Sequence, residues 1–181
     1  MKTIAWQTLL CCALLAGAAV AQAPSPYAGQ ESRDIKALSP QEIADLTAGR
    51  GMGLAKAAEL NGYPGPAHVL EMGAALDLTA DQRKQTEALF AKMQARAIAV
   101  GSELIDEERA LDAKFAAHTV SADELARSLA RIATLQRDLR EVHLHAHLDQ
   151  NALLTPAQIA HYNELRGYAT SSGEAHSHMH H

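Results

Sequence analysis

The chain has 181 residues, with 16 Lys or Arg against 21 Asp or Glu and hence a formal net charge of −5. This charge, and the lack of a basic stripe with interleaved aromatic residues, argue against nucleic-acid binding. Aromatic residues make up only 4% of the chain. Alanine and leucine dominate instead, which favours helices that pack through small and aliphatic side chains.

Residues 1–21 have the pattern of a secretory signal peptide, with an early lysine, an apolar stretch over residues 9–20 and small residues around an expected cleavage after Ala21. An uncleaved membrane anchor is the alternative, but the apolar stretch is short for a membrane span. Cys11 and Cys12 lie inside this stretch and would leave with it. The mature chain would then contain no disulfide, and helix packing or oligomerisation would have to stabilise it.

Four strings in the chain share one pattern, in which an apolar residue is followed by Ser or Thr, two further residues and then Gln or Glu. They are LSPQE (38–42), LTADQ (78–82), VSADE (120–124) and LTPAQ (154–158). This is the capping box, in which the hydroxyl accepts from the N3 backbone N–H and the N3 side chain reaches back to the N-cap. Each string therefore predicts a helix that starts directly after its Ser or Thr.

The first half of the chain is expected to contain short elements. The polar residues 22–37 predict an extended arm. A helix is predicted from Pro40 to about Leu60, with a break at GRGMG (49–53), because glycine weakens helices. The string NGYPGP (61–66) is rich in turn residues, and a short helix is predicted from Pro66 to Leu76.

The second half predicts two long helices and a shorter one. The first runs from the Thr79 cap to near His118, and 38 residues or so at 1.5 Å each give roughly 55 Å. The second runs from Ser121 to about Gln150, and a last helix runs from Thr155 to near Gly167. The short link between the long helices predicts an antiparallel hairpin. Since no segment alternates with a period of two, we expect an all-α fold without a sheet.

Apolar residues recur three or four positions apart along both long helices and predict their packed seam. On the first helix these are Leu89, Met93, Ala97, Val100, Leu104, Leu111 and Phe115, and on the second Leu125, Leu129, Ile132, Leu139, Val142 and Ala146. Leu144 and Leu148 lie off this seam. They suggest that the end of the second helix is covered by the last helix or by a partner chain.

The string HLHAH (143–147) is the most informative internal motif. At 100° per residue, His143 and His147 share one helical face near the seam, and His145 lies on another face. A histidine pair with this spacing can bind one metal ion, as in the HExxH helix. The glutamate of that motif is missing, which argues against a hydrolytic zinc site. His68, Glu71 and Met72 are candidate further ligands. The alternative is a pair of packed histidines bonded to carboxylates.

The chain ends in a second histidine cluster, HSHMHH. Imidazoles suit zinc, copper and nickel, and a thioether adds affinity for cuprous ion. We therefore expect metal capture by the tail, through His176, His178, Met179, His180 and His181. A remnant of an expression tag is the alternative, which the interrupting Ser177 and Met179 make a poor match.

Other motifs predict no catalysis. GRGMG lacks the preceding strand and the full spacing of a dinucleotide-binding loop, so a helix break is the better interpretation. No Ser/His/Asp set, cysteine nucleophile or close carboxylate pair stands out. A metalloenzyme is also disfavoured, because no general base lies beside the ligand pair. We expect a protein that is not an enzyme.

The two LTxxQ strings, LTADQ and LTPAQ, each open a predicted helix, and over residues 38–168 the chain resembles the Spy/CpxP-like family of periplasmic proteins. The resemblance implies a helical hairpin that dimerises, often into a curved cradle, and a periplasmic location. It also implies a protein that binds metal, or holds unfolded envelope proteins, and that often restrains a membrane-bound stress regulator. The tail resembles that of the zinc-resistance-associated branch. The ligand set of the nickel/cobalt sensor branch is not found at clear positions.

Two functions follow as hypotheses. The first is a periplasmic heavy-metal sensor or buffer that binds zinc or copper, with nickel as a further candidate. The second is an ATP-independent holdase chaperone with no dedicated metal role. The domains expected are the signal peptide (1–21), the arm (22–37), the helical LTxxQ domain (38–168) and a flexible His/Met-rich tail (169–181).

Overall fold

A computed structural model describes residues 25–168, so the expected signal peptide and the His/Met-rich tail lie outside the described residues. The helices are α1 (Pro40–Thr47), α2 (Lys56–Glu59), α3 (Pro66–Glu71), α4 (Ala80–Ala116), α5 (Ala122–Leu153) and α6 (Pro156–Leu165). No strand occurs between residues 25 and 168, and the predicted all-α class is confirmed. Residues 25–31 form turns in a separate N-terminal unit, and the packed unit described below begins at Ser32.

All four predicted capping boxes are present. Ser39, Thr79, Ser121 and Thr155 each accept a hydrogen bond from the N3 backbone N–H, and each N3 side chain returns to the N-cap backbone. The starts of four helices are therefore set by capping-box hydrogen bonds between residues that the sequence alone identifies. At the other ends, α4 stops two residues before His118, and α5 continues three residues beyond Gln150.

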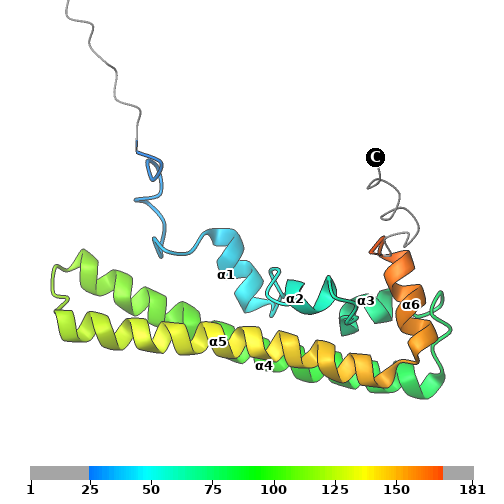
Figure 1. Ribbon diagram of the computed structural model, residues 1–181. Helices are drawn as coiled ribbons and strands as arrows, with labels where there is room; N and C mark the ends of the chain where they lie inside the picture. Colours follow the sequence, from blue (N-terminus) through cyan, green and yellow to red (C-terminus); the bar gives the residue numbers. More distant parts are fainter. Residues whose placement is uncertain (1–24, 169–181) are drawn as a thin grey trace, which may run out of the picture. The chain divides into compact units, whose positions relative to one another are not determined.

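The two long helices, α4 with 37 residues and α5 with 32, lie side by side and run in opposite directions (Figure 1). Their shared core is aliphatic, and it also contains Ile35, which precedes α1, and Leu46 of α1. The helical members are Ala97, Val100, Leu104 and Ile105 on α4 and Ile132, Leu135 and Leu139 on α5. Ile35 is fully buried, although it falls within the segment that the sequence assigns to the arm.

The prediction that Phe115 and Leu129 lie in the packed seam is wrong. Phe115 is 52% exposed and Leu129 is 50% exposed, whereas the unpredicted Leu135 is 2% exposed. Leu129 and Leu135 lie on opposite sides of Ile132 around the helix, each about 60° from it. The contact face follows Ser128, Ile132, Leu135 and Leu139, so Leu129 flanks it and stays exposed. Phe115 lies in the last turn of α4, next to the link at residues 117–121.

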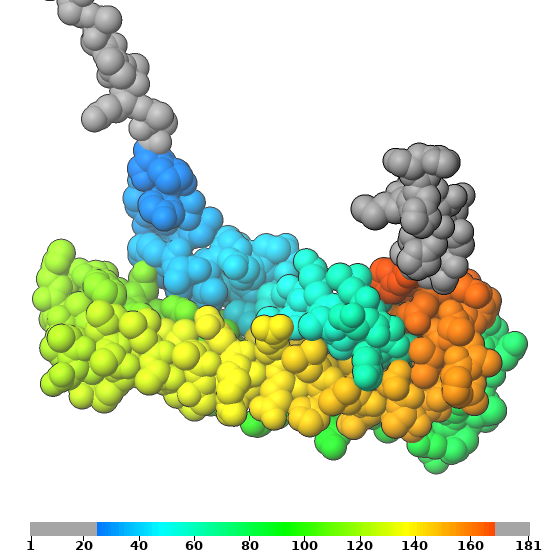
Figure 2. Space-filling view, in the orientation of Figure 1, coloured from blue at the N-terminus to red at the C-terminus, as the bar shows by residue number. Residues whose placement is uncertain are grey.

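Helices α1, α2 and α3 pack along the long helices, as Figure 2 shows for residues coloured cyan to teal. The predicted break over residues 49–53 is confirmed, because α1 ends at Thr47 and turns separate it from α2. The backbones of α1 and α4 approach closely at one point. A Cβ atom on Gly101 would lie 2.7 Å from the Leu46 carbonyl oxygen, so only glycine fits there without a shift.

At the end of the pair opposite the link, where α4 begins and α5 ends, α3 and α6 cover the long helices. Val69, Leu76, Leu154 and Tyr162 form a second apolar cluster there. The glutamines of the two LTxxQ strings meet beside it: Gln82 Nε2 donates to Gln158 Oε1 at 2.9 Å, and Gln158 Nε2 donates to Gln82 Oε1 at 3.0 Å. Each amide also donates to a backbone carbonyl, Gln82 to Leu153 at the end of α5 and Gln158 to Leu76 in the turns after α3. The two motifs therefore join the start of α4 to the start of α6.

Within residues 25–168, no helix combines the length and the apolar character that a membrane span requires.

Candidate metal site

Two histidines of HLHAH are buried on one face of α5. His143 is 4% exposed and His147 is 8% exposed, whereas the side chain of His145 is 63% exposed. The predicted division of the three histidines between two faces is therefore confirmed. Burial lowers the pKa of His143, and the nearby His147 lowers it further. His143 is therefore held as the neutral imidazole, which is the form that binds metals.

Turns in the chain before α4 enclose these two imidazoles. A Cβ atom on Gly51, inside the GRGMG break, would lie 3.6 Å from His143 Nδ1. A Cβ atom on Gly65, inside the NGYPGP turn, would lie only 2.8 Å from His147 Cε1. The glycine at position 65 is thus needed for the backbone to approach the His147 ring, while position 51 has ordinary clearance.

The His147 ring is oriented by a hydrogen bond. Its Nδ1 lies 2.7 Å from the carbonyl oxygen of Tyr63. A carbonyl can only accept, so Nδ1 carries the proton and the lone pair of the neutral ring is on Nε2. A backbone carbonyl that fixes the tautomer in this way is the usual support of a metal-binding histidine.

His143 differs from His147, because its Nε2 atom is buried without a hydrogen-bond partner. Buried polar atoms in native proteins are nearly always paired, so each exception requires a physical reason. Both rings line a pocket of about 420 Å³ between the long helices and the turns before α4. We call it the histidine pocket. Its further lining residues that bear on its chemistry are Arg50, Met52, Lys56, Glu59, His68, Phe90, Met93 and Gln94.

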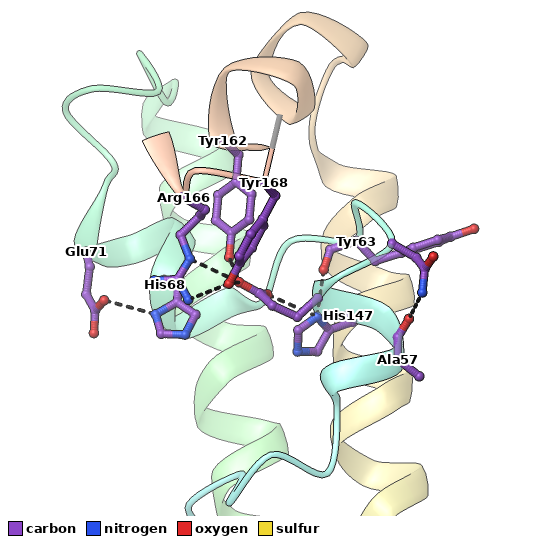
Figure 3. A network of polar contacts seen from close by, with 10 residues as sticks. Ala57, Tyr63, His68, Glu71, His147, Tyr162, Arg166 and Tyr168 are labelled. Atoms are coloured by element: carbon purple, nitrogen blue, oxygen red, sulfur yellow. Dashed lines mark hydrogen bonds and ion pairs between the residues drawn. The ribbon is translucent and has the colours of Figure 1, made fainter. Parts of the chain in front are cut away.

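Glu59 of α2 is the carboxylate nearest to His147, with Oε2 3.8 Å from His147 Nδ1. Its other oxygen, Oε1, accepts hydrogen bonds from Tyr162 Oη at 2.7 Å, Arg166 Nε at 3.1 Å and Tyr168 Oη at 3.2 Å. Figure 3 shows these three donors beside His147. Burial raises the pKa of Tyr162, with the bond to Glu59 contributing. Glu59 therefore ties α2 to α6 and the residues after it.

Of the three further ligands suggested by the sequence, His68, Glu71 and Met72, only His68 lines the histidine pocket. His68 hydrogen-bonds to Glu71 at 3.1 Å, and Met72 packs against the α3–α6 cluster instead. In the part of the chain that the structure describes, no three His, Cys, Asp or Glu side chains are grouped so as to hold a metal ion. His176, His178, Met179, His180 and His181 lie outside the described residues.

Sequence reasoning missed the role of Glu59 and of the Tyr63 carbonyl. Glu59 belongs to the four-residue helix α2 and Tyr63 to the loop after it, and such short elements have no periodicity that would mark a residue as buried. It also placed Met93 on the seam without linking it to the histidines, although Met93 and Phe90 line the same pocket. The distance along the chain from position 93 to position 143 hides that proximity.

A second hollow, of about 1150 Å³, lies between α1, α5 and the residues after α1. We call it the apolar groove. Leu38, Leu46, Met52, Leu54, Leu104, Leu139, Leu144 and Leu148 supply its apolar lining. The predicted cover over Leu148 is not present within the described chain, since that side chain is 51% exposed.

Comparisons with protein-family models, with curated proteins and with solved structures each returned no match.

Proposed function

We propose that this chain is a metal-binding stress protein of the periplasm, a heavy-metal sensor or buffer, whose helical body holds the ion through His143 and His147. The observation that carries the proposal is the buried, unpartnered Nε2 of His143, in a pocket shared with His147. One turn of helix separates the two rings, a spacing that lets two imidazoles bind one ion. A bound ion would also satisfy the orphan nitrogen.

The rest of the proposal follows from the sequence. The expected signal peptide supports export, and the two LTxxQ strings support an antiparallel Spy/CpxP-like hairpin that dimerises. Its partners would be divalent or cuprous ions and a membrane-bound stress regulator. Zinc and copper are the candidate ions, with nickel as a further one. The short link at residues 117–121 and the shared core of α4 and α5 are the features that support the hairpin.

The test separates metal binding by the helical body, residues 32–168, from metal binding by the tail, residues 169–181. We would titrate Zn²⁺, Cu²⁺ and Ni²⁺ calorimetrically into the mature chain, residues 22–181, and into the same chain with H176S, H178S, M179L, H180S and H181S. We expect binding with micromolar or tighter affinity to survive in this tail-substituted chain. Loss of all binding with the tail substitutions would contradict a body site and leave a metal-capturing appendage.

Two glycine variants sharpen this test without removing any donor atom. In Gly65→Ala the new methyl group meets the His147 ring at 2.8 Å, whereas in Gly51→Ala it meets His143 at 3.6 Å, an ordinary contact. On the tail-substituted background, Gly65→Ala should weaken binding, and Gly51→Ala should not. Circular dichroism would verify that both variants keep their helices. Equal affinities in the two variants would argue against His147 as a ligand.

The apolar groove favours a second candidate function, an ATP-independent holdase. The lining of this opening includes eight leucine or methionine side chains, and Met52 and Leu148 are both more than 40% exposed, which suits an apolar client segment with a polar rim. The test is aggregation of a heat-denatured client without nucleotide or metal. Leu148→Gln should weaken the protection if the groove holds the client. Failure of the unmodified chain to slow aggregation at several-fold excess would remove this candidate.

A further inference from the structure

The donors that surround the histidine pocket point to one class of ion. Zinc in proteins is normally held by four ligands drawn from Cys, His, Asp and Glu. Among residues 25–168 no group of even three such side chains is placed to hold an ion. His143 and His147 can supply two neutral nitrogens. A body site therefore needs either water or a donor of another kind to complete it.

Met93 supplies a donor of another kind. It belongs to α4 and lines the histidine pocket together with Phe90, His143 and His147. A thioether sulfur is a soft ligand that binds cuprous ion well and binds Zn²⁺ and Ni²⁺ poorly. Two imidazoles and one thioether form a set that suits cuprous ion, since this ion accepts low coordination numbers.

The charge balance of the pocket favours a monovalent ion as well. Glu59 is the one carboxylate among the lining residues; its Oε1 accepts from Tyr162, Arg166 and Tyr168, and its Oε2 is buried without a hydrogen-bond partner, 3.8 Å from His147 Nδ1. The lining therefore supplies a single negative charge, which Arg166 already pairs with. Lys56 adds a positive charge to the lining. The free energy of taking an ion out of water rises with the square of its charge, so the penalty for a monovalent ion is about a quarter of that for a divalent ion of equal size.

We infer that the histidine pocket is a cuprous site, in which His143 Nε2, His147 Nε2 and the Met93 thioether bind one Cu⁺ ion. This inference rests on the proposed metal-binding function and specifies its ion. The Tyr63 carbonyl sets the tautomer of His147, and burial keeps His143 neutral and without a competing hydrogen bond. The ion enters and leaves as Cu⁺, so no electron is transferred.

The experiment uses the mature chain, residues 22–181, with the tail substitutions, because Cys11, Cys12, Met179 and the tail histidines would otherwise bind copper themselves. Cu⁺ affinity would be measured anaerobically by competition with bicinchoninate, and Zn²⁺ affinity by competition with a zinc chelator. Met93→Leu keeps the volume and removes the sulfur. Met72→Leu, at a methionine of the α3–α6 cluster, is the matched control.

We expect Met93→Leu to weaken Cu⁺ binding about tenfold or more while Zn²⁺ affinity stays nearly unchanged, and Met72→Leu to change neither. X-ray absorption at the copper edge should show a sulfur neighbour that Met93→Leu removes. Unchanged Cu⁺ affinity in Met93→Leu, or an absorption spectrum without sulfur, would overturn the cuprous site while Zn²⁺ or Ni²⁺ binding by the body still upheld the proposed function. No binding of any of these ions would overturn both.

Discussion

The α4–α5 pair has two ends with different interiors. Its aliphatic end, defined by the cluster from Ala97 to Ile105 on α4 and from Ile132 to Leu139 on α5, contains apolar side chains apart from Ser128. Its polar end, defined by Thr86 on α4 and by His143, His147 and Gln150 on α5, buries four polar side chains within one region of the same two helices. Glu59 adds a nearly buried carboxylate there.

The two ends differ in what burial costs the folded protein. Aliphatic packing stabilises a helix pair without special requirements, whereas each buried polar atom must be paired or it destabilises the fold. At the polar end, His143 Nε2, Gln150 Oε1 and Glu59 Oε2 are buried without hydrogen-bond partners. A chain that needed only a stable pair of helices could continue the aliphatic seam. We therefore propose that the polar end is the functional one.

The largest expected effect is on the aliphatic end. Leu135→Ala should lower the free energy of unfolding by about 2–5 kcal/mol, because it opens a cavity in a packed core. Leu129→Ala, on the same helix but half exposed, should change it by less than about 0.5 kcal/mol. Urea unfolding would measure both. Metal affinity should be unaffected by either variant. A loss of affinity in Leu135→Ala under native conditions would contradict the claim that the aliphatic end takes no part in metal binding.

At the polar end, Glu59→Ala should lower the free energy of unfolding by about 2–3 kcal/mol, because Tyr162, Arg166 and Tyr168 lose their common acceptor. The matched control is Glu71→Ala on the neighbouring helix, whose carboxylate is 67% exposed. Urea unfolding again gives the comparison. If the two glutamate variants were equally stable, the network around Glu59 would contribute nothing to the fold.

A smaller effect is expected at the junction of the two LTxxQ strings. Gln82→Ala and Gln158→Ala should each lower the free energy of unfolding by about 1–2 kcal/mol, and the double variant by less than their sum, because each removes the other's partner. Gln85→Ala, whose amide bonds only to an exposed carboxylate, is the control. Strict additivity in the double-mutant cycle would show that the two amides are not coupled.

The smallest expected effect is a pH dependence of the metal-free protein. The folded state lowers the pKa of His143 below its ordinary value, so the unfolded chain takes up that proton first as the pH falls. The stability is therefore present above about pH 6.5 and is lost as the pH falls through that value toward the folded pKa. Thermal unfolding with a chelator, from about pH 7.5 to about pH 5.5, should show a decline that His143→Gln reduces. The exposed His145→Gln should leave the decline intact; a decline unchanged in His143→Gln would contradict the assignment.

Local chemistry made much of the fold predictable. The capping boxes located the starts of α1, α4, α5 and α6, because their hydrogen bonds join residues three apart in the sequence. The glycines of GRGMG located the break after α1. Burial was predicted less well, since Leu129 and Leu135 have the same apolar character but lie on opposite sides of Ile132 around the helix, and only Leu135 is covered.

The candidate site was predictable only in part. The i, i+4 spacing within HLHAH placed His143 and His147 on one buried face, because both lie on one helix. The carbonyl of Tyr63, the carboxylate of Glu59 and the lining position of Met93 depend on contacts between segments far apart in the chain. No local pattern encodes such contacts, so the structure was needed to bring these groups together.

The central claim is that the two buried imidazoles of α5 bind the ion. The most direct measurement is a long-range ¹H–¹⁵N spectrum of the histidine rings in the tail-substituted chain without residues 1–21, before and after one equivalent of diamagnetic Zn²⁺ or Cu⁺. We predict that metal-free His147 carries its proton on Nδ1, and that with Cu⁺ the Nε2 signals of both His143 and His147 shift while that of His145 does not. Unchanged signals of His143 and His147 under both ions would contradict the claim.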